Sequence, residues 1–230
     1  FLVLSQNLID LTERYVEEPA MLAAVENRIS RWKKILKQSR GNSMSLEKQM
    51  GLITELLCLK DVLAPKIGIK AALISWVGCD HDKQDFITDN TLLEVKSFRI
   101  TKGKKISISS LDQLNSQKDP LYLLCYGVSI NESGLSIKSI VDEIYTTLIE
   151  QSFDLMAIFE NKLFEYGYLP QINEDQGLIN LSVESFDVYE VQGSFPKLNT
   201  DDVDSRISKV KYSIDLEKCD EFLANINTIL

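Results

Sequence analysis

Three charged residues near the middle of the chain have the types and spacing that phosphodiester hydrolysis needs. Asp85 is followed along the chain by Glu94 and Lys96. Mg²⁺ prefers oxygen ligands and keeps several waters, so two carboxylates leave positions for a phosphate and an attacking water. Lys96 would orient that water or, with its pKa lowered by the nearby cation, accept a proton from it. These residues predict a hydrolase that uses Mg²⁺, with Mn²⁺ as a substitute.

A β-hairpin would bring these side chains together, with Asp89-Asn90 as its two-residue loop. The cross-strand pairs are then Thr88 with Thr91, Ile87 with Leu92, Phe86 with Leu93, and Asp85 with Glu94. Directly opposed side chains have Cβ atoms about 4.5 to 5.5 Å apart, so two carboxylates there repel unless a cation neutralises them. Lys96 lies two residues beyond Glu94 and therefore on the same face of the strand. The hairpin predicts one surface that carries both carboxylates and the amine.

A further acidic residue, Glu55, lies within a predicted helix over residues 46–63. Its neighbours at three and four positions along that helix are Gly51, Leu52, Cys58 and Leu59. Because carboxylates are almost never buried without a partner, Glu55 is expected to face a metal and its water, or solvent at the edge of the apolar face. Gly51 costs a helix about 1 kcal/mol relative to alanine, which indicates a close approach by another element or a ligand.

Hydrophobic periodicity and turn residues place the other elements around the hairpin. Helices are predicted over residues 8–38, in two pieces broken near Pro19, and over 46–63, most of 137–164, and 216–230. Further strands are predicted over residues 105–109, 121–130, 178–191 and 209–214, and residues 71–77 fit a strand or a helix end. Ser43 or Ser45 should cap the helix over 46–63, Ala64-Pro65 should end it, and Ser110 with Gln113 forms a capping box that opens another helix. The apolar face of the first helix, which should pack on the core, consists of Leu22, Val25, Ile29, Trp32 and Leu36.

Several segments together resemble a family of PD-(D/E)XK proteins within the restriction-endonuclease-like superfamily. They are GLITELLCL (51–59), Trp76-Val77-Gly78 followed by Asp85-Phe86, LLEVKSF (92–98) and ISSLDQL (108–114). The similarity spans about residues 45–126. An E-x-K triplet alone is common, so the resemblance depends on the ordered set of segments within a fitting strand pattern. The proline of the family's name is absent, because Gln84 precedes Asp85.

The resemblance implies a mixed α/β fold in which helices flank a central mixed β-sheet, with the order helix, three strands, helix and strand. It implies a nuclease core over residues 45–136. Residues 1–44 would add N-terminal helices, and residues 137–230 a helix and strand extension of the same domain. By their positions in the motifs, Glu55, Asp85 and Glu94 would bind Mg²⁺, and all three would act in catalysis together with Lys96.

Weaker candidates lie beside this set. Gln113 would contact the substrate or the active-site water, although the capping box explains it without catalysis. The densest basic stretch consists of Lys96, Arg99, Lys102, Lys104 and Lys105, of which the last four would contact DNA or form a solvated turn. Asp80, His81 and Asp82 would bind a metal or remain a solvated loop. His81 is the only histidine, which excludes a multi-histidine zinc site. No glycine-rich phosphate-binding loop is present, so ATP hydrolysis is not expected.

Composition limits the class of protein. The net charge of -9 argues against bulk electrostatic coating of nucleic acid, so any DNA contact must be local. The four cysteines are scattered and are expected to be reduced thiols in a cytoplasmic protein. No apolar run approaches the roughly 18 residues of a membrane span, and no signal peptide is recognised.

Three functions remain open at this point. The first, implied by the resemblance, is a Mg²⁺-dependent DNA endonuclease that acts as the cleavage subunit of a restriction or anti-phage defence system, as a homodimer or with a partner subunit. The second is a non-catalytic relative of the same fold that binds DNA or protein. The third is an α/β interaction domain in which Glu94 and Lys96 form only a surface ion pair. The third leaves the opposed carboxylates and Glu55 unexplained.

Overall fold

The computed structural model describes residues 5, 8–9, 11–13, 15–38, 44–80, 83–116, 120–149, 151–169 and 177–229. The helices are α2 (Glu18–Gln38), α3 (Leu46–Leu57), α4 (Ala64–Ile67), α5 (Ile69–Ser75), α6 (Ile137–Ile149) and α7 (Phe153–Tyr166). The strands are β1 (Phe86–Ile87), β2 (Leu92–Arg99), β3 (Lys105–Ile108), β4 (Leu121–Ser136), β5 (Asn180–Glu190) and β6 (Tyr212–Asp215). No helix in these ranges is both long and apolar enough to cross a membrane.

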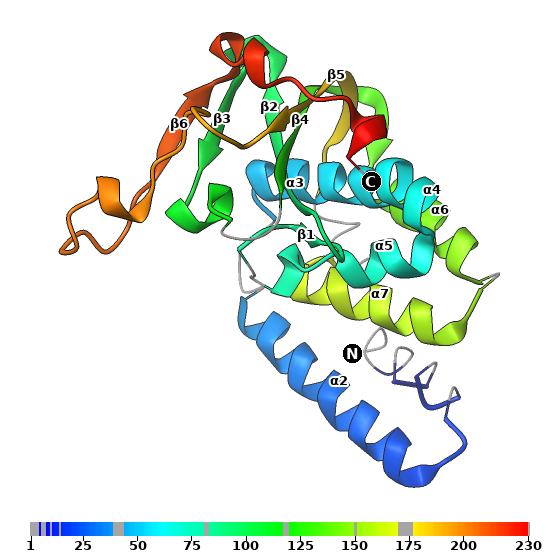
Figure 1. The fold of residues 1–230 in the computed structure, drawn as a ribbon. Helices are drawn as coiled ribbons and strands as arrows, with labels where there is room; N and C mark the ends of the chain where they lie inside the picture. Colours follow the sequence, from blue (N-terminus) through cyan, green and yellow to red (C-terminus); the bar gives the residue numbers. More distant parts are fainter. Residues whose placement is uncertain are drawn as a thin grey trace.

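The strands form a four-stranded sheet in the order β1-β2-β4-β5 and a separate two-stranded sheet of β3 and β6. In the larger sheet β2 and β4 are parallel, and the other pairs are antiparallel. Figure 1 shows helices on one side of this sheet and the β3–β6 pair on the other. The mixed α/β fold class with a mixed central sheet is therefore confirmed.

Two apolar cores hold these layers together, one on each face of the main sheet. Alternate residues of a strand point to opposite faces, so β2 contributes side chains to both cores. Leu93 and Val95 of β2 pack against the helices, in a core that contains Leu52 and Leu56 of α3. Phe98 of β2 packs on the other face, in a second core. The residues that β3 and β6 contribute to that core are Ile106, Ile108 and Ile214. The predicted strand over 105–109 thus forms, but it belongs to the outer layer and not to the main sheet.

Helix α3 begins as predicted, because the Ser45 side chain accepts a hydrogen bond from the Lys48 backbone N–H at 3.3 Å. The predicted end at Ala64-Pro65 is wrong. A π-helical turn over Cys58–Leu63 leads directly into α4, and this wider turn accommodates Pro65, which has no N–H to donate. The chain leaves the helix only at Gly68, whose φ of 81° favours glycine.

Three other predictions need correction. Residues 69–75 form the helix α5, so the strand alternative for 71–77 is wrong. The helix expected from Ser110 is one 3₁₀ turn, Leu111–Leu114, and Ser110 makes no side-chain cap. The helix expected over 216–230 is replaced by the 3₁₀ turns Leu216–Lys218, Asp220–Phe222 and Ile226–Thr228.

The C-terminal segment is extended between its turns because it pairs with the edge of β5. Leu223 forms an isolated bridge with Tyr189. The Ala224 N–H donates to the Val188 carbonyl at 2.8 Å. These bonds to the sheet replace the internal hydrogen bonds that a helix would have made.

Helix α2 has Pro19 in its first turn, where a missing N–H costs nothing. It lies beside α7 at the bottom of Figure 1, and Arg28 forms an ion pair with Glu160 of α7 at 3.3 Å. Leu22 is 51% exposed, so the predicted apolar face does not pack on the core along its whole length. The side chains of Trp32 and Leu36 lie outside the described residues, as does Ser43.

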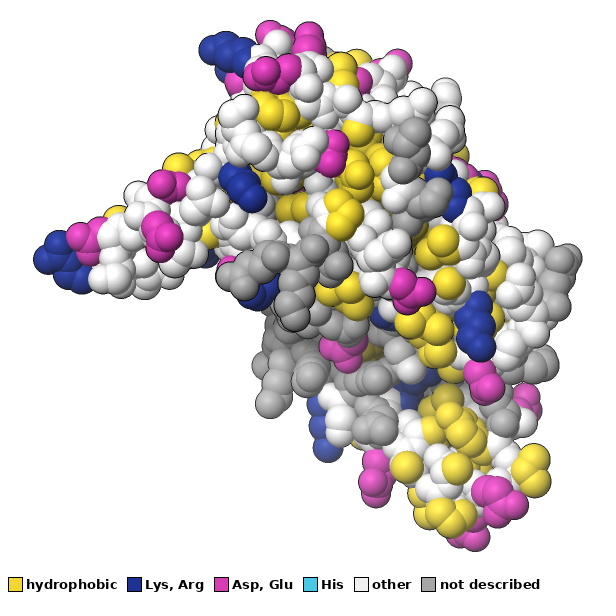
Figure 2. Space-filling model, in the orientation of Figure 1, with side chains coloured by type: hydrophobic (Ala, Val, Ile, Leu, Met, Phe, Trp, Pro, Cys, Tyr) yellow, Lys and Arg dark blue, Asp and Glu magenta, His cyan; other side chains and the backbone are white. Residues whose placement is uncertain are grey.

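The segment between β5 and β6 projects from the body of the protein (Figures 1 and 2). It contains the 3₁₀ turn Thr200–Asp202, in which Asn199 and Asp202 form a capping box. Both acidic and basic side chains lie on this projection in Figure 2.

Candidate active site

The hairpin has the predicted register, since Phe86 pairs with Leu93 and Ile87 with Leu92. The Thr88 N–H donates to the Thr91 carbonyl at 2.9 Å and closes the loop. Asp85 lies one position before β1, just beyond the last pair of residues between β1 and β2. This places its side chain at the edge of β2, beside Glu94.

Hydrogen bonds fix Asp85 on both sides. Its carboxylate accepts from the Val95 backbone N–H at 2.8 Å. Its backbone carbonyl accepts from the N–H groups of Val77 and Gly78, each at 2.9 Å. Burial raises the pKa of Asp85, while the nearby Lys96 and the Val95 N–H act in the opposite direction. The segment Val77-Gly78 therefore holds Asp85 against β2.

Glu94 is completely buried, at 0% exposure. Lys96 donates to Glu94 Oε1, and the two form an ion pair. Glu94 Oε2 has no hydrogen-bond partner among the described residues. Burial and the Asp85 carboxylate raise the pKa of Glu94 to about 8, although Lys96 opposes the shift. Burial lowers the pKa of Lys96, but Glu94 and Asp85 outweigh it and the pKa is raised.

Glu55 is buried next to this group, with two aromatic donors bound to its carboxylate. Trp76 Nε1 donates to Glu55 Oε2 at 2.7 Å, and the Tyr166 hydroxyl donates to Oε1 at 2.9 Å. Burial and the charge of Asp85 raise the pKa of Glu55 well above its usual range, despite both donors. Sequence reasoning missed the two donors, and the only signal that pointed toward Tyr166 was Gly51.

Two glycines leave room for the side chains of the site. A Cβ at Gly51 would lie 2.8 Å from the Tyr166 hydroxyl. A Cβ at Gly78 would lie 2.7 Å from Asp85 Oδ1 and 3.1 Å from Glu55 Oε2. The space that a Cβ of residue 78 would fill is therefore bordered by both carboxylates, so Glu55 and Asp85 converge beside Gly78. The close approach that Gly51 indicated is the hydroxyl of Tyr166.

A double-mutant cycle at Gly51 and Tyr166 tests this packing without any assay of activity. Alone, Gly51→Ala should leave the free energy of unfolding nearly unchanged, because the new methyl group displaces the Tyr166 hydroxyl from Glu55 and offsets the gain in helix propensity. In a Tyr166→Phe background the hydroxyl is gone, so the same change should add up to about 1 kcal/mol from helix propensity. Urea unfolding of the four proteins measures the coupling, expected at about 1 kcal/mol. Additive effects would show that the two residues do not interact.

The donor set fits a hard divalent cation. Asp85, Glu94 and Glu55 supply carboxylate oxygens of the kind that Mg²⁺ binds, and Glu94 Oε2 is a buried acceptor with no partner. Across the ranges that the structure describes, however, no three His, Cys, Asp or Glu side chains are close enough to form a ready metal site. Instead, Lys96 donates to Glu94, the Val95 N–H donates to Asp85, and Trp76 and Tyr166 donate to Glu55.

A hollow of about 370 Å³ opens beside Asp85. Its other lining residues are Gly78, Lys83, Ser109, Ser110, Asp112 and Gln113. Gln113, a predicted substrate contact, is therefore brought to the site. Its side-chain oxygen accepts from the Ser109 N–H at 2.9 Å and from the Ser109 hydroxyl at 3.0 Å. Gln113 therefore does not form the predicted capping box with Ser110. Its side chain is hydrogen-bonded to Ser109 instead.

The predicted basic stretch does not gather at this hollow. Arg99 lies five residues beyond Glu94 in β2, about 16 Å along a strand. Lys104 pairs with Asp187 of β5 at 3.2 Å. Lys102 and Lys105 are exposed. His81, Asp82 and the side chain of Asp80 lie outside the described residues, so the loop metal site is untested.

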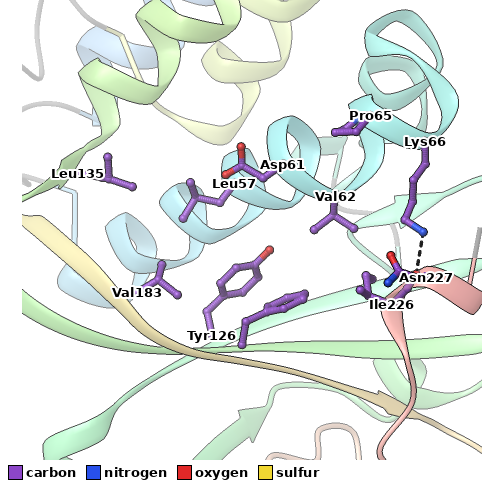
Figure 3. A pocket seen from close by; sticks show the side chains of 11 residues that line it. Leu57, Asp61, Val62, Pro65, Lys66, Tyr126, Leu135, Val183, Ile226 and Asn227 are labelled. Atoms are coloured by element: carbon purple, nitrogen blue, oxygen red, sulfur yellow. Dashed lines mark hydrogen bonds between the residues drawn. The ribbon is translucent and has the colours of Figure 1, made fainter.

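A larger hollow of about 610 Å³ lies between α3, α4 and the face of β4 and β5 (Figure 3). Its lining is mostly apolar and includes Leu57, Val62 and Tyr126. Lys66, at one end, donates to the Ile226 carbonyl at 2.8 Å. None of the candidate carboxylates lines this larger hollow. The smaller hollow at Asp85 is therefore the better candidate for phosphate chemistry.

Comparison with known proteins gives one match. Residues 1–217 match the model of a protein family described as "Putative PD-(D/E)XK family member". No curated protein and no solved structure matches the chain. The match covers every residue of the candidate site, from Glu55 to Gln113, and also Tyr166.

Proposed function

Since the chain belongs to this PD-(D/E)XK family and has its nuclease-like fold, we propose that it is a Mg²⁺-dependent deoxyribonuclease that hydrolyses phosphodiester bonds. The observation that carries the proposal is the convergence of Asp85 and Glu55 at Gly78, next to a fully buried Glu94 that touches Lys96. Such a group of buried charges is costly to maintain in a merely structural role.

Each residue has a role that follows from its contacts. Asp85 and Glu94 would hold Mg²⁺, since their carboxylates are adjacent at the edge of β2, and Glu55 would complete the set from α3. When bound, the cation would stabilise negative charge on the phosphate. Lys96 is placed to hold an attacking water or a phosphate oxygen through its ammonium group. Gln113 and Ser109 line the approach to Asp85 and would orient the substrate.

The biological setting that we propose is a restriction or anti-phage defence system, in which the chain would be the cleavage subunit. This rests on the resemblance to restriction-endonuclease-like proteins alone. A homodimer or a partner subunit is part of the same proposal, because cutting both strands of a duplex requires two active sites or two events.

Plasmid cleavage tests the enzymatic proposal. Wild-type protein should nick or cut plasmid DNA with Mg²⁺ or Mn²⁺ and stop in EDTA. Asp85→Asn should lower the rate on the order of 100-fold or more, because it removes one ligand charge. Asp112→Asn is the matched control, since Asp112 lines the same hollow but is exposed. Equal activity of Asp85→Asn and wild type would overturn the assignment.

One observation favours a non-catalytic DNA- or protein-binding module as the second candidate. The carboxylates have partners within the protein, since Lys96 donates to Glu94, and Trp76 and Tyr166 donate to Glu55. The two candidates differ in thermal unfolding with Mn²⁺. A cation at 100 times its dissociation constant should add about 2.7 kcal/mol to the free energy of unfolding, whereas a closed ion-pair network should gain nothing.

A further inference from the structure

The two-stranded sheet of β3 and β6 has one buried and one exposed face. Ile106 and Ile214 are paired and face the main sheet. On the other face, Ser107 is opposite Ser213, and both are exposed. This outer face carries hydroxyl groups in place of apolar side chains.

Lysines lie at both ends of the same face. Lys105, two residues before Ser107, is exposed and is opposite Asp215. Lys211, two residues before Ser213, is also exposed, and strand alternation continues the outer face to it. We call the group of Lys105, Ser107, Ser213 and Lys211 the β3–β6 strip. Lysine and serine side chains are among those that contact the sugar-phosphate backbone of DNA.

The strip leads to the candidate active site. Ser109 follows β3 by one residue and lies two residues from Ser107, about 7 Å along a strand. Ser109 and Gln113 are hydrogen-bonded and line the hollow that contains Asp85. A backbone that lies on the strip would therefore continue over this hollow.

Basic side chains lie along this path from the strip to the hollow. The chain has a net charge of -9, so a phosphate contact must be made by a local group of basic residues. Asp215 is opposite Lys105, at the end of the strip away from the hollow. Lys83, on the wall of the hollow, adds a positive charge near Asp85, although Asp112 lies 3.7 Å from it. By contrast, Lys104 forms an ion pair with Asp187 of β5 and does not belong to the strip.

We propose that the β3–β6 strip binds the phosphate backbone of DNA and directs it across the hollow to Asp85. This inference rests on the proposed function, because it names how the substrate of that site is held. Its contacts carry no base information, so the strip supports binding to DNA of any sequence.

Fluorescence anisotropy with a labelled DNA duplex tests the strip, with Ca²⁺ in place of Mg²⁺ to limit cleavage. We expect Lys211→Glu and Lys105→Glu each to weaken binding about 10-fold and to lower the dependence of log K on log salt by about one. The milder Lys211→Gln should have a smaller effect in the same direction. The matched control is Lys70→Glu, which makes the same charge change at an exposed position of α5. Thermal unfolding of each variant checks that it is folded.

The outcomes separate this inference from the proposed function. Loss of affinity in the strip variants but not in Lys70→Glu supports the strip, even if the wild type never cuts DNA. Equal loss in Lys70→Glu would show a general charge effect and overturn it, as would a wild type that binds no DNA.

Discussion

Lys96→Met is expected to lower the free energy of unfolding by about 3 kcal/mol when divalent cations are removed. Lys96 is the cation that touches the fully buried Glu94, and Asp85 is close enough to raise the pKa of Glu94. Removing the ammonium leaves buried carboxylates without a positive partner. Urea unfolding in EDTA, at a pH above the pKa of Glu94, measures the loss, and plasmid cleavage by the same variant should be abolished.

The double variant Lys96→Met with Glu94→Gln is the control for this result. It removes both charges of the pair, so it should recover much of the stability while staying inactive in cleavage. A single variant as stable as the wild type would show that Lys96 does not neutralise the site. A double variant no more stable than the single one would show that the loss comes from packing of the lysine stem.

Gly78→Ala is the second change for which we expect a large effect. The added methyl group would lie 2.7 Å from Asp85 Oδ1 and 3.1 Å from the Asp85 Cα, and the backbone atom cannot simply swing away. We expect about 2 kcal/mol of destabilisation and loss of Mg²⁺-dependent cleavage, because Asp85 and Glu55 can no longer converge. Urea unfolding and plasmid nicking measure the two effects.

Gly68→Ala provides the matched comparison. Gly68 has a φ of 81°, and no atom of the described residues beyond its chain neighbours and local helix backbone would lie within 4 Å of an added Cβ, so alanine there strains the backbone without touching the site. It should lose a similar amount of stability, about 1 to 3 kcal/mol, yet keep its cleavage rate per folded molecule. If Gly78→Ala behaves like Gly68→Ala in cleavage, the contact between Gly78 and the two carboxylates has no functional role.

Local sequence signals predicted the parts of the site that depend on neighbours in the chain. The pair Asp89-Asn90 is a turn signal, and the register that it predicted for Phe86 and Ile87 is confirmed. The register in turn places Asp85 beside Glu94. Ser45 likewise predicted the start of α3, because capping needs only the next three residues. The assignment of these residues to catalysis stays a prediction.

Contacts between distant segments could not be predicted in this way. The Tyr166 hydroxyl binds a carboxylate 111 residues earlier, and no local pattern links the two. The same holds for β3, whose partner β6 lies about a hundred residues later and draws it out of the main sheet. The helix expected over 216–230 failed for a related reason: bonds to Val188 and Tyr189 override the helical pattern of the segment. The ion pair of Lys104 with Asp187 of β5 is a further contact of this kind, and the role of the other basic residues in binding DNA stays a prediction.

The C-terminal segment also affects how copies of this chain can associate. A strand at the margin of a sheet offers unpaired N–H and C=O groups to any other extended chain, which is a common route to intermolecular sheets and aggregates. Here Leu223 and Ala224 lie beyond the part that matches the family, and they occupy that margin at Tyr189 and Val188. A dimer that joined two sheets along this edge of β5 would first have to displace the C-terminal segment from Val188 and Tyr189. Assembly without that cost must use another surface.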